Sequence, residues 1–379
     1  MRVLHIMSGF GGGISSFILN KAKYFQDKSV AFDVITFDKV SAEFLQTIEG
    51  TGGHVYRISN PKTEGVNIYY QEVNAVMQSV PKETFVHCHI RGYRAIPFYM
   101  IAKKNGLKRF GIHAHTTGLP EEINSLKNKR VRMINNALAK EKISCGVEAS
   151  KYLFGPQYVE KHQIMHIPNS IDPEKFIRRI TINKESLLGI QNGDTFVIGH
   201  IGRFRSVKNH LFMLEIIELL KETSLNFVWV FAGDGDDFEK IKALASEKGL
   251  DPYIQFLGRR EDIPELLQVM DVFVLPSKYE GFPTVAVEAQ ASDTQTFLAE
   301  VITREVDLGL NLAEFLSTDT PEVWADRILL QHSRKRRMRS LTPSGVRLNK
   351  LKEKKLTNEA SAGLYQAFLK NKITHYEMD

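Results

Sequence analysis

Two glutamates, Glu280 and Glu288, are the first candidates for chemistry and lie in the segment KYEGFPTVAVEAQASD. The apolar run DVFVLPS before them predicts a buried strand. Pro276, near the end of that run, and Gly281 predict a loop. Glu280 is therefore expected just outside the carboxyl end of a strand. Pro283 suits the first position of a helix, which places Glu288 about 7.5 Å further along the helix axis.

The start of that helix predicts a site for an anion. Its first free N–H groups belong to residues near Phe282, Thr284 and Val285, and the helix dipole adds positive charge there. Carboxylates accept hydrogen bonds from sugar hydroxyls. The spacing therefore predicts a nucleotide sugar, with Glu280 at the hexose, the helix start at the diphosphate and Glu288 at the ribose. Considered alone, the pair is better explained as a capping acid and a solvated helix acid.

A basic loop in the same half of the chain favours the nucleotide-sugar interpretation of the two glutamates over the capping interpretation. The segment GHIGRFRSVKNH places Arg203 and Lys208 after a predicted strand and before a predicted helix, and Gly202 lets the backbone turn closely. Two cations in such a loop can neutralise a diphosphate while it departs with growing charge. A basic loop at a domain edge is the alternative, but together with the two glutamates the loop favours a nucleotide-sugar site.

A glycine loop follows the first predicted strand, in the segment GFGGGISS. Its glycines Gly11, Gly12 and Gly13 would allow close approach of a phosphate or an acceptor. The loop departs from the dinucleotide-binding fingerprint, because Asp38 follows the next strand but no acid is clearly placed for a ribose. By itself this loop is weak evidence for a ligand.

Two His-x-His pairs, His87/His89 and His113/His115, also stand in predicted strands. Residues i and i+2 of a strand face the same side, so either pair could bind a metal. No acidic ligand is next to them in the sequence, and we expect no metal ion. His115 precedes TTG, which favours a place at the lip of an active site, and we interpret the other three as packing residues.

Two charged segments are not interpreted as sites. Asp234 and Asp236 precede a predicted helix, and capping of that helix explains them better than metal binding does. The basic run RKRRMRS at 334–340 predicts a solvated patch or one that faces lipid headgroups. No aromatic interleaving or nucleic-acid motif accompanies it, and we expect no nucleic-acid partner.

The chain of 379 residues alternates short strand-like runs with helical patterns, which predicts parallel sheets covered by helices on both faces. Two similar strand–glycine loop–helix units predict two doubly wound domains that face a central cleft. The expected domains are 1–170 and 191–356, with a linker at 171–190 and a C-terminal helix in 357–379. The predicted strands are RVLHIM, FDVITF, HVYRI, FVHCHI, RFGIHAH, TFVIGHIG, NFVWVFAG, IQFLG and VFVLPS.

Composition and charge indicate an ordinary globular protein. No apolar run approaches the roughly 18 residues that span a bilayer, and the start MRVLHIM does not predict a signal peptide. Cys88 and Cys145 fit buried thiols in a reducing cytoplasm. Residues 1–170 hold 22 Lys and Arg against 13 Asp and Glu, a net charge of +9, which can attract an anionic substrate or a lipid surface or can simply be a solvated surface.

With these residues in view, nearly the whole chain resembles the retaining glycosyltransferases of the GT-B fold in the large GT4 family, especially those of bacterial exopolysaccharide and capsule synthesis. The resemblance is carried by the glycine loop and by HAHTTG, IPNSID, GRFRSVKNH, FLGRREDIPELL and EGFPTVAVEAQAS. One departure is the sequence Asp293-Thr294-Gln295, where the family usually has Gly-Leu-Pro. A left-handed residue is expected there as the helix ends, and Asp can partly tolerate that conformation.

The resemblance implies a nucleotide-diphosphate sugar donor, expected to be a UDP-sugar, no required metal ion, and retention of configuration. It implies that Arg203 and Lys208 hold the diphosphate, Glu280 the sugar and Glu288 the ribose. It also places His115 near the reacting sugar, backbone amides from Phe282 to Val285 at sugar and phosphate, and the loop of Gly258 and Arg259 beside the base.

The resulting hypothesis is a cytoplasmic hexosyltransferase of exopolysaccharide or cell-surface polysaccharide synthesis. Its acceptor is expected to be a saccharide. A lipid-linked saccharide would bring the basic N-terminal domain to the inner face of the membrane. Two alternatives remain open at this point. One is another enzyme of the same fold, such as a sugar-nucleotide epimerase or a phosphorylase. The other is a non-catalytic nucleotide-sugar-binding subunit that partners an active transferase.

Overall fold

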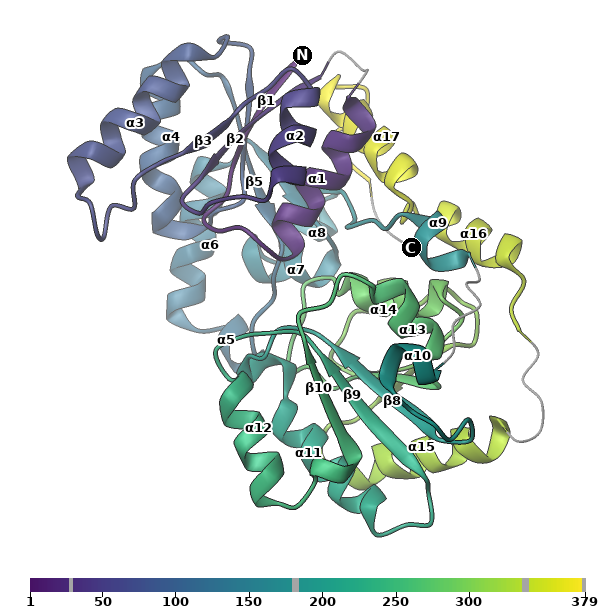
Figure 1. Ribbon diagram of the computed structural model, residues 1–379. Helices are drawn as coiled ribbons and strands as arrows, with labels where there is room; N and C mark the ends of the chain where they lie inside the picture. The colour runs from purple at the N-terminus through teal and green to yellow at the C-terminus, as the bar shows by residue number, and fades with distance from the viewer. Residues whose placement is uncertain (27–29, 179–183, 336–340, 377–379) are drawn as a thin grey trace. The chain divides into compact units, whose positions relative to one another are not determined.

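The computed structural model describes residues 1–26, 30–178, 184–335 and 341–376 (Figure 1). The chain folds as two compact units, Met1–Ile171 with Lys355–Asp379, and Asp172–Lys354. The predicted linker at 171–190 falls mostly within the second unit, where it forms two short helices, α9 (Pro173–Ile177) and α10 (Lys184–Leu188).

The first unit contains a seven-stranded parallel sheet in the order β3-β2-β1-β4-β5-β6-β7. Its strands are β1 (Arg2–Ile6), β2 (Ala31–Thr36), β3 (Val55–Arg57), β4 (Phe85–Cys88), β5 (Arg109–Ala114), β6 (Glu141–Ser144) and β7 (Met165–His166). Its helices are α1 (Gly13–Phe25), α2 (Ala42–Gly50), α3 (Val66–Ser79), η1 (Gly92–Ala95), α4 (Ile96–Lys104), α5 (Pro120–Ile123), α6 (Leu126–Leu138), α7 (Val147–Leu153), α8 (Pro156–Glu160) and α17 (Asn358–Leu369).

The second unit contains a six-stranded parallel sheet in the order β10-β9-β8-β11-β12-β13. Its strands are β8 (Phe196–Ile201), β9 (Phe227–Ala232), β10 (Ile254–Gly258), β11 (Val272–Leu275), β12 (Gln295–Ala299) and β13 (Ala313–Leu316). The remaining elements are η2 (Ser206–Lys208), α11 (His210–Lys221), α12 (Phe238–Glu247), η3 (Asp251–Tyr253), α13 (Ile263–Val269), α14 (Thr284–Ala291), η4 (Arg304–Val306), α15 (Pro321–Lys335) and α16 (Ser344–Glu353).

Both sheets have the strand order of doubly wound folds, which confirms the predicted fold class. All nine predicted strands are present, and the sequence interpretation missed β6, β7, β12 and β13. The central strands β8, β9 and β11 are buried almost throughout, as expected for parallel strands covered on both faces. The predicted basic patch at 334–340 lies mostly outside the described residues.

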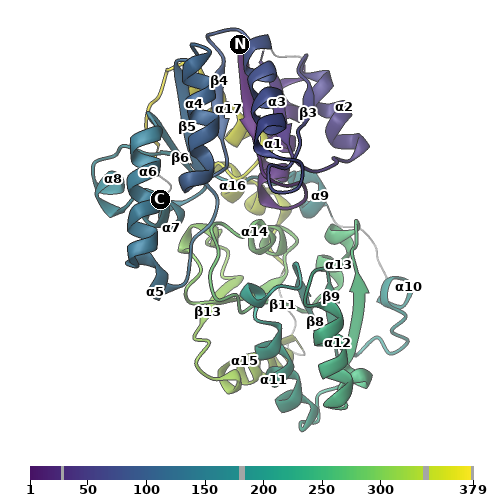
Figure 2. The same cartoon turned by 90° about the vertical axis from the view of Figure 1, so that its left-hand side faces the viewer.

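The tail of the chain returns to the first unit, although no sequence pattern indicates which domain it joins. Helix α17 lies beside α1, as both ribbon views show (Figures 1 and 2). Tyr365, Phe368 and Leu369 of α17 are part of the core that also contains Phe17 and Phe25 of α1. Burial of this apolar surface fastens the tail to the sheet.

Lys21 of α1 lies at the junction with α17 and is fully buried. Its ammonium donates to the hydroxyl of Ser361 at 2.6 Å and to that of Ser170 at 3.2 Å. Burial lowers the pKa of Lys21 from 10.5 to about 7.

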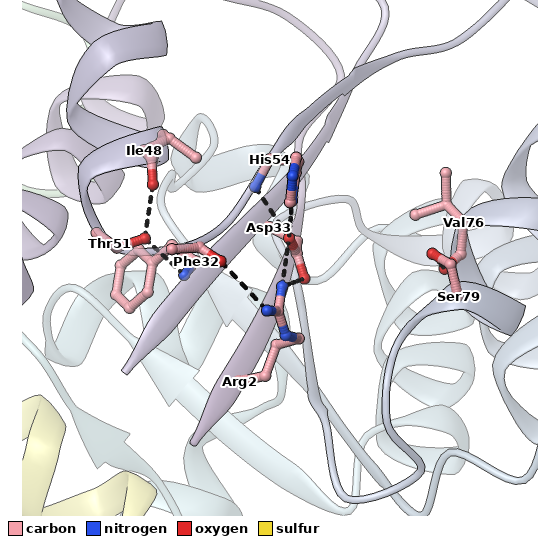
Figure 3. Close-up of polar contacts among 9 residues, drawn as sticks. Arg2, Phe32, Asp33, Ile48, Thr51, His54, Val76 and Ser79 are labelled. Atoms are coloured by element: carbon pink, nitrogen blue, oxygen red, sulfur yellow. Dashed lines mark hydrogen bonds and ion pairs between the residues drawn. The ribbon is translucent and has the colours of Figure 1, made fainter. Parts of the chain in front are cut away.

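An ion pair between Arg2 and Asp33 joins β1 to its neighbour β2 (Figure 3). Arg2 donates to both carboxylate oxygens of the buried Asp33, at 2.8 and 2.7 Å, and the backbone N–H of His54 donates to the same carboxylate at 3.0 Å. Because Asp33 is fully buried, these bonds satisfy a charge that would otherwise be costly. The two cysteines, Cys88 and Cys145, are free and buried, as predicted.

Candidate active site

In the second unit the site begins where the strand order reverses. Strands β8 and β11 are neighbours in the sheet, although two strands lie between them in the sequence. In open α/β sheets, ligands bind in the crevice outside the carboxyl ends of such a pair. The loops that follow β8 and β11 are joined there by a backbone hydrogen bond from Lys278 to Val207 at 2.9 Å.

The loops bring together two residues that the sequence singled out separately. Lys208 Nζ donates to Glu280 Oε1 at 2.6 Å, and the side chains are only 17% and 15% exposed. Gly202 is close to Lys208, because a Cβ at that position would lie 3.3 Å from Lys208 Cε and 2.9 Å from His200 Nε2. Arg203 follows Gly202 in the same loop and is exposed. The loop thus offers two cations beside a fixed carboxylate.

Helix α14 begins at Thr284, one residue later than predicted, with Pro283 at the N-cap. Phe282 is buried beneath the loop, and no side chain caps the helix. The first-turn N–H groups of a helix have no partner within the helix, so those of Thr284 and Val285 have the geometry for an anion.

Glu288 lies in the second turn of α14 and is partly buried. Burial raises the pKa of its carboxyl from 4.5 to about 7. The carboxyl can therefore be protonated or ionised near neutral pH, unlike an ordinary surface glutamate.

The loops after β9 and β10 close the edge of the site by backbone contact. Gly233 donates its N–H to the carbonyl of Gly258 at 2.7 Å, and a Cβ on Gly233 would lie 1.9 Å from the carbonyl oxygen of Gly202. A Cβ on Gly235 would likewise lie 2.5 Å from the carbonyl oxygen of Phe204. These contacts require glycine, and the Gly-x-Gly spacing after a strand was the signal that the sequence interpretation passed over.

The expectation for Asp234 and Asp236 was wrong. The N-cap of α12 is Asp237, and no side chain caps that helix. The Asp234 carbonyl instead accepts a hydrogen bond from the Phe204 N–H at 2.7 Å. Arg259 is exposed in the loop that follows β10.

The first unit contributes the glycine loop. Gly11 and Gly12 have positive φ, at 87° and 121°, and Gly13 begins α1. The carboxylate of Asp38 accepts the N–H of Phe10 at 2.9 Å, so Asp38 holds the loop in place. The two φ values explain glycine at the first two positions, and the exposed helix start leaves the backbone approachable.

Five histidines converge at the middle of the same sheet. His5 of β1 lies opposite His87 of β4, and the remaining members are His89, His113 and His115. His5 Nδ1 lies 3.0 Å from His89 Nε2, and His89 Nδ1 lies 2.7 Å from His115 Nε2. Burial lowers the pKa of His5 and of His115 to about 3, so both rings are neutral near pH 7.

A second chain runs beside the first. The Tyr365 hydroxyl lies 2.6 Å from His87 Nδ1, and His87 Nε2 lies 3.0 Å from His113 Nδ1. The histidines predicted to be packing residues are therefore buried but also hydrogen-bonded, and the sequence interpretation missed His5. Among the described residues, two sets of three have ligand atoms within 4.8 Å of one another and could hold a metal: His5, His87 and His89, and His89, His113 and His115.

Comparison with known proteins agrees with this fold. Residues 188–301 match the model of the family "Glycosyl transferases group 1". The chain is 34% identical over 339 residues to EpsF of Bacillus subtilis, which is named as a glycosyltransferase, and the match covers 86% of each protein.

A further relative matches over a shorter stretch of sequence, and a solved structure matches in fold. A UDP-Gal:alpha-D-GlcNAc-diphosphoundecaprenol alpha-1,3-galactosyltransferase of Escherichia coli is 35% identical over 149 residues, 38% of each chain. Among solved structures, Anabaena Alr3699/HepE in complex with UDP-glucose has a TM-score of 0.79 at 17% identity, covering 98% of this chain and 100% of that one.

The chain belongs to the glycosyl transferases group 1 family and is a glycosyltransferase of the GT-B fold. The predicted resemblance to GT4-type bacterial enzymes of exopolysaccharide and capsule synthesis is confirmed. Within the described residues, no helix has both the length and the apolar character needed to cross a bilayer.

Proposed function

We propose that this glycosyltransferase moves a hexosyl group from a nucleotide-diphosphate sugar, preferably a UDP-sugar, to an acceptor hydroxyl with retention of configuration. The observation that carries the proposal is the Lys208–Glu280 pair beside the start of α14, because it joins a cation, a carboxylate and helix amides at one sheet edge. Relatives named for capsular polysaccharide synthesis and structures that contain UDP or UDP-glucose support this choice of substrate.

In the proposed reaction the bond between the anomeric carbon and the diphosphate breaks, and a bond to the acceptor oxygen forms on the same face. The acceptor proton passes to an oxygen of the departing phosphate. Arg203, Lys208 and the first-turn N–H groups of α14 stabilise the charge that develops on the diphosphate. Glu280 holds the hydroxyls of the sugar, and Glu288 holds those of the ribose.

Further residues have supporting roles in this proposal. The loop that contains Gly258 and Arg259 flanks the base, the loop of Gly11, Gly12 and Gly13 faces the acceptor, and His115 contacts the reacting sugar. Because the site has its own cations, we propose that transfer needs no metal ion and persists in excess chelator.

The acceptor is proposed to be a lipid-linked saccharide. The relative from Escherichia coli is named for a diphosphoundecaprenol-linked acceptor, and the first 170 residues have a net charge of +9. We propose that the first unit contacts an anionic membrane surface through exposed residues of α3 and α4.

The test is a donor panel with purified protein. Nucleotide release is measured for UDP-, GDP- and ADP-hexoses, with and without lipid-linked saccharides, and the anomeric configuration of the product is determined by NMR. Release of UDP that depends on the acceptor, with a retained anomeric centre, is the expected result. An epimerised donor with no acceptor requirement, or donor binding with no turnover unless another protein is added, would contradict the proposal.

A further inference from the structure

The inference concerns a buried imidazole beneath the loop that contains Lys208. His200 of β8 is completely buried, and its Nδ1 lies 2.9 Å from the carbonyl oxygen of Val274 on the neighbouring strand β11. A carbonyl oxygen can only accept, so Nδ1 holds the ring proton. Burial lowers the pKa of His200 well below 6.5, so the ring is neutral near pH 7 and its Nε2 presents a lone pair.

This lone pair lacks a donor. Within the part of the chain that the structure describes, His200 Nε2 has no hydrogen-bond partner. Buried polar atoms are nearly always hydrogen-bonded, because an unpaired one costs about 1–3 kcal/mol. The bond to the Val274 carbonyl fixes the lone pair in one direction, so a matching donor has to come from the loop that covers it.

The ammonium of Lys208 is placed to supply that donor. A Cβ on Gly202 would lie 2.9 Å from His200 Nε2 and 3.3 Å from Lys208 Cε. The missing side chain of Gly202 therefore leaves one small space that the imidazole and the lysine side chain both border. The ammonium is one bond beyond Cε, so rotation about the last bonds of Lys208 can bring it into this space.

Charge gives a reason for such a rotation. In the structure the ammonium donates to the carboxylate of Glu280 at 2.6 Å, so the carboxylate offsets much of its positive charge. A diphosphate at the start of α14 gains least from a cation that is already neutralised in this way. The neutral ring of His200 can hold the ammonium through a hydrogen bond without cancelling its charge.

We propose that Lys208 has a second position, over Gly202, in which its ammonium donates to His200 Nε2 while it contacts the diphosphate. Lys208 takes this position when a nucleoside diphosphate binds. His200 is then a positioning residue, because it acts on the diphosphate only through Lys208. This inference rests on the proposed function, which places the diphosphate at Lys208.

Two other partners for the neighbouring groups become outcomes of the test. A buried water can satisfy His200 Nε2, in which case His200 and Lys208 act independently. His210, the first residue of α11, is a second imidazole whose buried Nε2 has no partner among the described residues. It is hydrogen-bonded to the backbone of Arg205 and stacks on Phe204, with ring centroids 4.1 Å apart.

The test is a double-mutant cycle on the calorimetric affinity for UDP, with uridine as the reference ligand that lacks the diphosphate. His200→Phe keeps a planar ring in the core and removes the acceptor. It should weaken the binding of UDP about tenfold and leave the affinity for uridine unchanged. In the Lys208→Met background the same substitution should change UDP affinity by less than about twofold, because the donor is absent. His200→Gln can place an amide oxygen where Nε2 stood and should recover most of the loss.

A spectroscopic measurement reports whether the ammonium reaches the ring. Protein with ¹⁵N-labelled histidine is examined by long-range ¹H–¹⁵N correlation, and His200 is assigned by the loss of its signals in His200→Phe. The free protein should show the Nδ1–H form of His200. Addition of UDP should shift the Nε2 signal in the direction of a hydrogen-bonded acceptor, and the same addition to Lys208→Met should leave it in place.

His210→Phe is the matched control, because it replaces the neighbouring buried imidazole and should keep the UDP affinity of the wild type within about twofold. Gly202→Ala fills the shared space and serves if His200→Phe does not fold; it should weaken UDP and abolish the shift of Nε2. Circular dichroism confirms folding of each variant.

Three results would overturn the proposal: equal losses of UDP affinity from His200→Phe in the wild-type and Lys208→Met backgrounds, equal losses from His200→Phe and His210→Phe, or an Nε2–H form of His200 in the free protein. Each of these leaves the proposed function standing, provided that the wild type binds UDP. A wild type that binds no nucleoside diphosphate would overturn both proposals.

Discussion

Lys208 and Glu280 form a 2.6 Å ion pair across 72 residues of sequence. The pair joins the loop after β8 to the loop after β11, and neither side chain is more than 17% exposed. Partial burial removes much of the solvent screening that makes surface pairs weak. The carboxylate is therefore held in one orientation before any ligand arrives, which is what a group that recognises a sugar requires.

The first prediction concerns the role of Glu280. Glu280→Gln should lower kcat by about 10- to 150-fold, because a charged hydrogen bond to the reacting sugar contributes about 1.5–3 kcal/mol. Binding of UDP should persist, since the amide oxygen can still accept from Lys208. Initial rates at saturating donor and calorimetric titration with UDP measure the two effects.

Glu239→Gln is the matched control for that substitution, because Glu239 is an exposed acid on α12 in the same unit. It should leave both quantities at the wild-type level. Unchanged turnover of Glu280→Gln at saturating donor would exclude Glu280 from the recognition of the sugar.

The second prediction follows from the raised pKa of Glu288, which is about 7. If Glu288 accepts hydrogen bonds from the ribose, the ionised form binds better, so UDP affinity should rise as pH increases from 6 to 8. The gain should be about fivefold, since a charged acceptor adds about 1 kcal/mol over a neutral one. Glu288→Gln removes this contribution, so any pH dependence that remains belongs to the nucleotide's own phosphate. Identical pH profiles for both proteins would contradict the assignment.

The sequence indicated where the candidate residues stand in the fold better than it indicated which residues they contact. Glycine and proline mark the strand–helix junctions in the sequence, and these junctions hold Arg203, Lys208, Glu280 and Glu288. The Lys208–Glu280 bond was not predictable, because it depends on β8 lying beside β11.

His5 was missed for a related reason. A single histidine in an apolar strand has the pattern of a core residue, and only the register of β1 against β4 places it opposite His87. The docking of α17 on α1 was likewise invisible, because an amphipathic tail does not specify which domain it covers. In each case local pattern determines the element, whereas packing between distant segments determines the contact.

The third prediction concerns Lys21, whose pKa falls from 10.5 in the unfolded chain to about 7 in the fold. Between these values the unfolded state binds more protons, so the stability of the first unit should rise with pH from about 7 to 10. Lys21→Met should reduce that rise by a few kcal/mol, on the order expected for a shift of this size. Chemical denaturation followed by circular dichroism at pH 7 and pH 9.5 measures the difference.

Lys23→Met is the control for this effect, since Lys23 is on the same helix but is 40% exposed and paired with Glu43. It should keep the wild-type pH dependence. The pKa of Lys21 is not depressed in solution if Lys21→Met and the wild type gain equal stability between the two pH values.

The fourth prediction concerns Asp293, where the chain departs from the usual family pattern. Asp293 has φ of 63° at the end of α14, and the N–H groups of Asp293 and Thr294 bond to the carbonyls of Gln290 and Ala289 at 3.0 and 2.9 Å. This is the Schellman arrangement, in which glycine is favoured at the left-handed position. The Asp293 carboxylate also accepts the N–H of Thr342 at 3.3 Å.

Comparing Asp293→Gly with Asp293→Ala isolates the contribution of the left-handed backbone conformation to the free energy of unfolding, because both variants lack the carboxylate. The alanine variant should be about 1 kcal/mol less stable than the glycine variant, because only glycine adopts this conformation without strain. Fluorescence of Trp229 and Trp324 reports on unfolding, since both tryptophans are buried in the second unit. Equal stability of the two variants would mean that the left-handed conformation is not present in solution.

The last prediction concerns membrane contact by the first unit. Lys103 and Lys104 are exposed in the last turn of α4. The apolar side chains of Val66, Ile68 and Met100 on α3 and α4 are exposed as well. Arg109, by contrast, cannot belong to such a surface, because it is bonded to Glu141 at 2.8 and 2.9 Å and to the Leu369 carbonyl at 2.9 Å.

Each basic residue near an anionic leaflet contributes about 1 kcal/mol, and salt screens that attraction beyond about 8–10 Å. Co-sedimentation with phosphatidylglycerol vesicles should therefore weaken as salt increases. Lys103→Gln with Lys104→Gln should weaken it by about 10- to 30-fold at low salt without changing UDP affinity.

The matched control neutralises two exposed lysines of the second unit, Lys240 and Lys242 of α12. It removes the same amount of charge, so it distinguishes a local contact surface from the effect of net charge alone. Equal weakening by the two double variants would mean that the attraction is non-specific. No binding to anionic vesicles at low salt would leave these lysines as a solvated surface, and an acceptor free in solution would then explain the site better than a lipid-linked one.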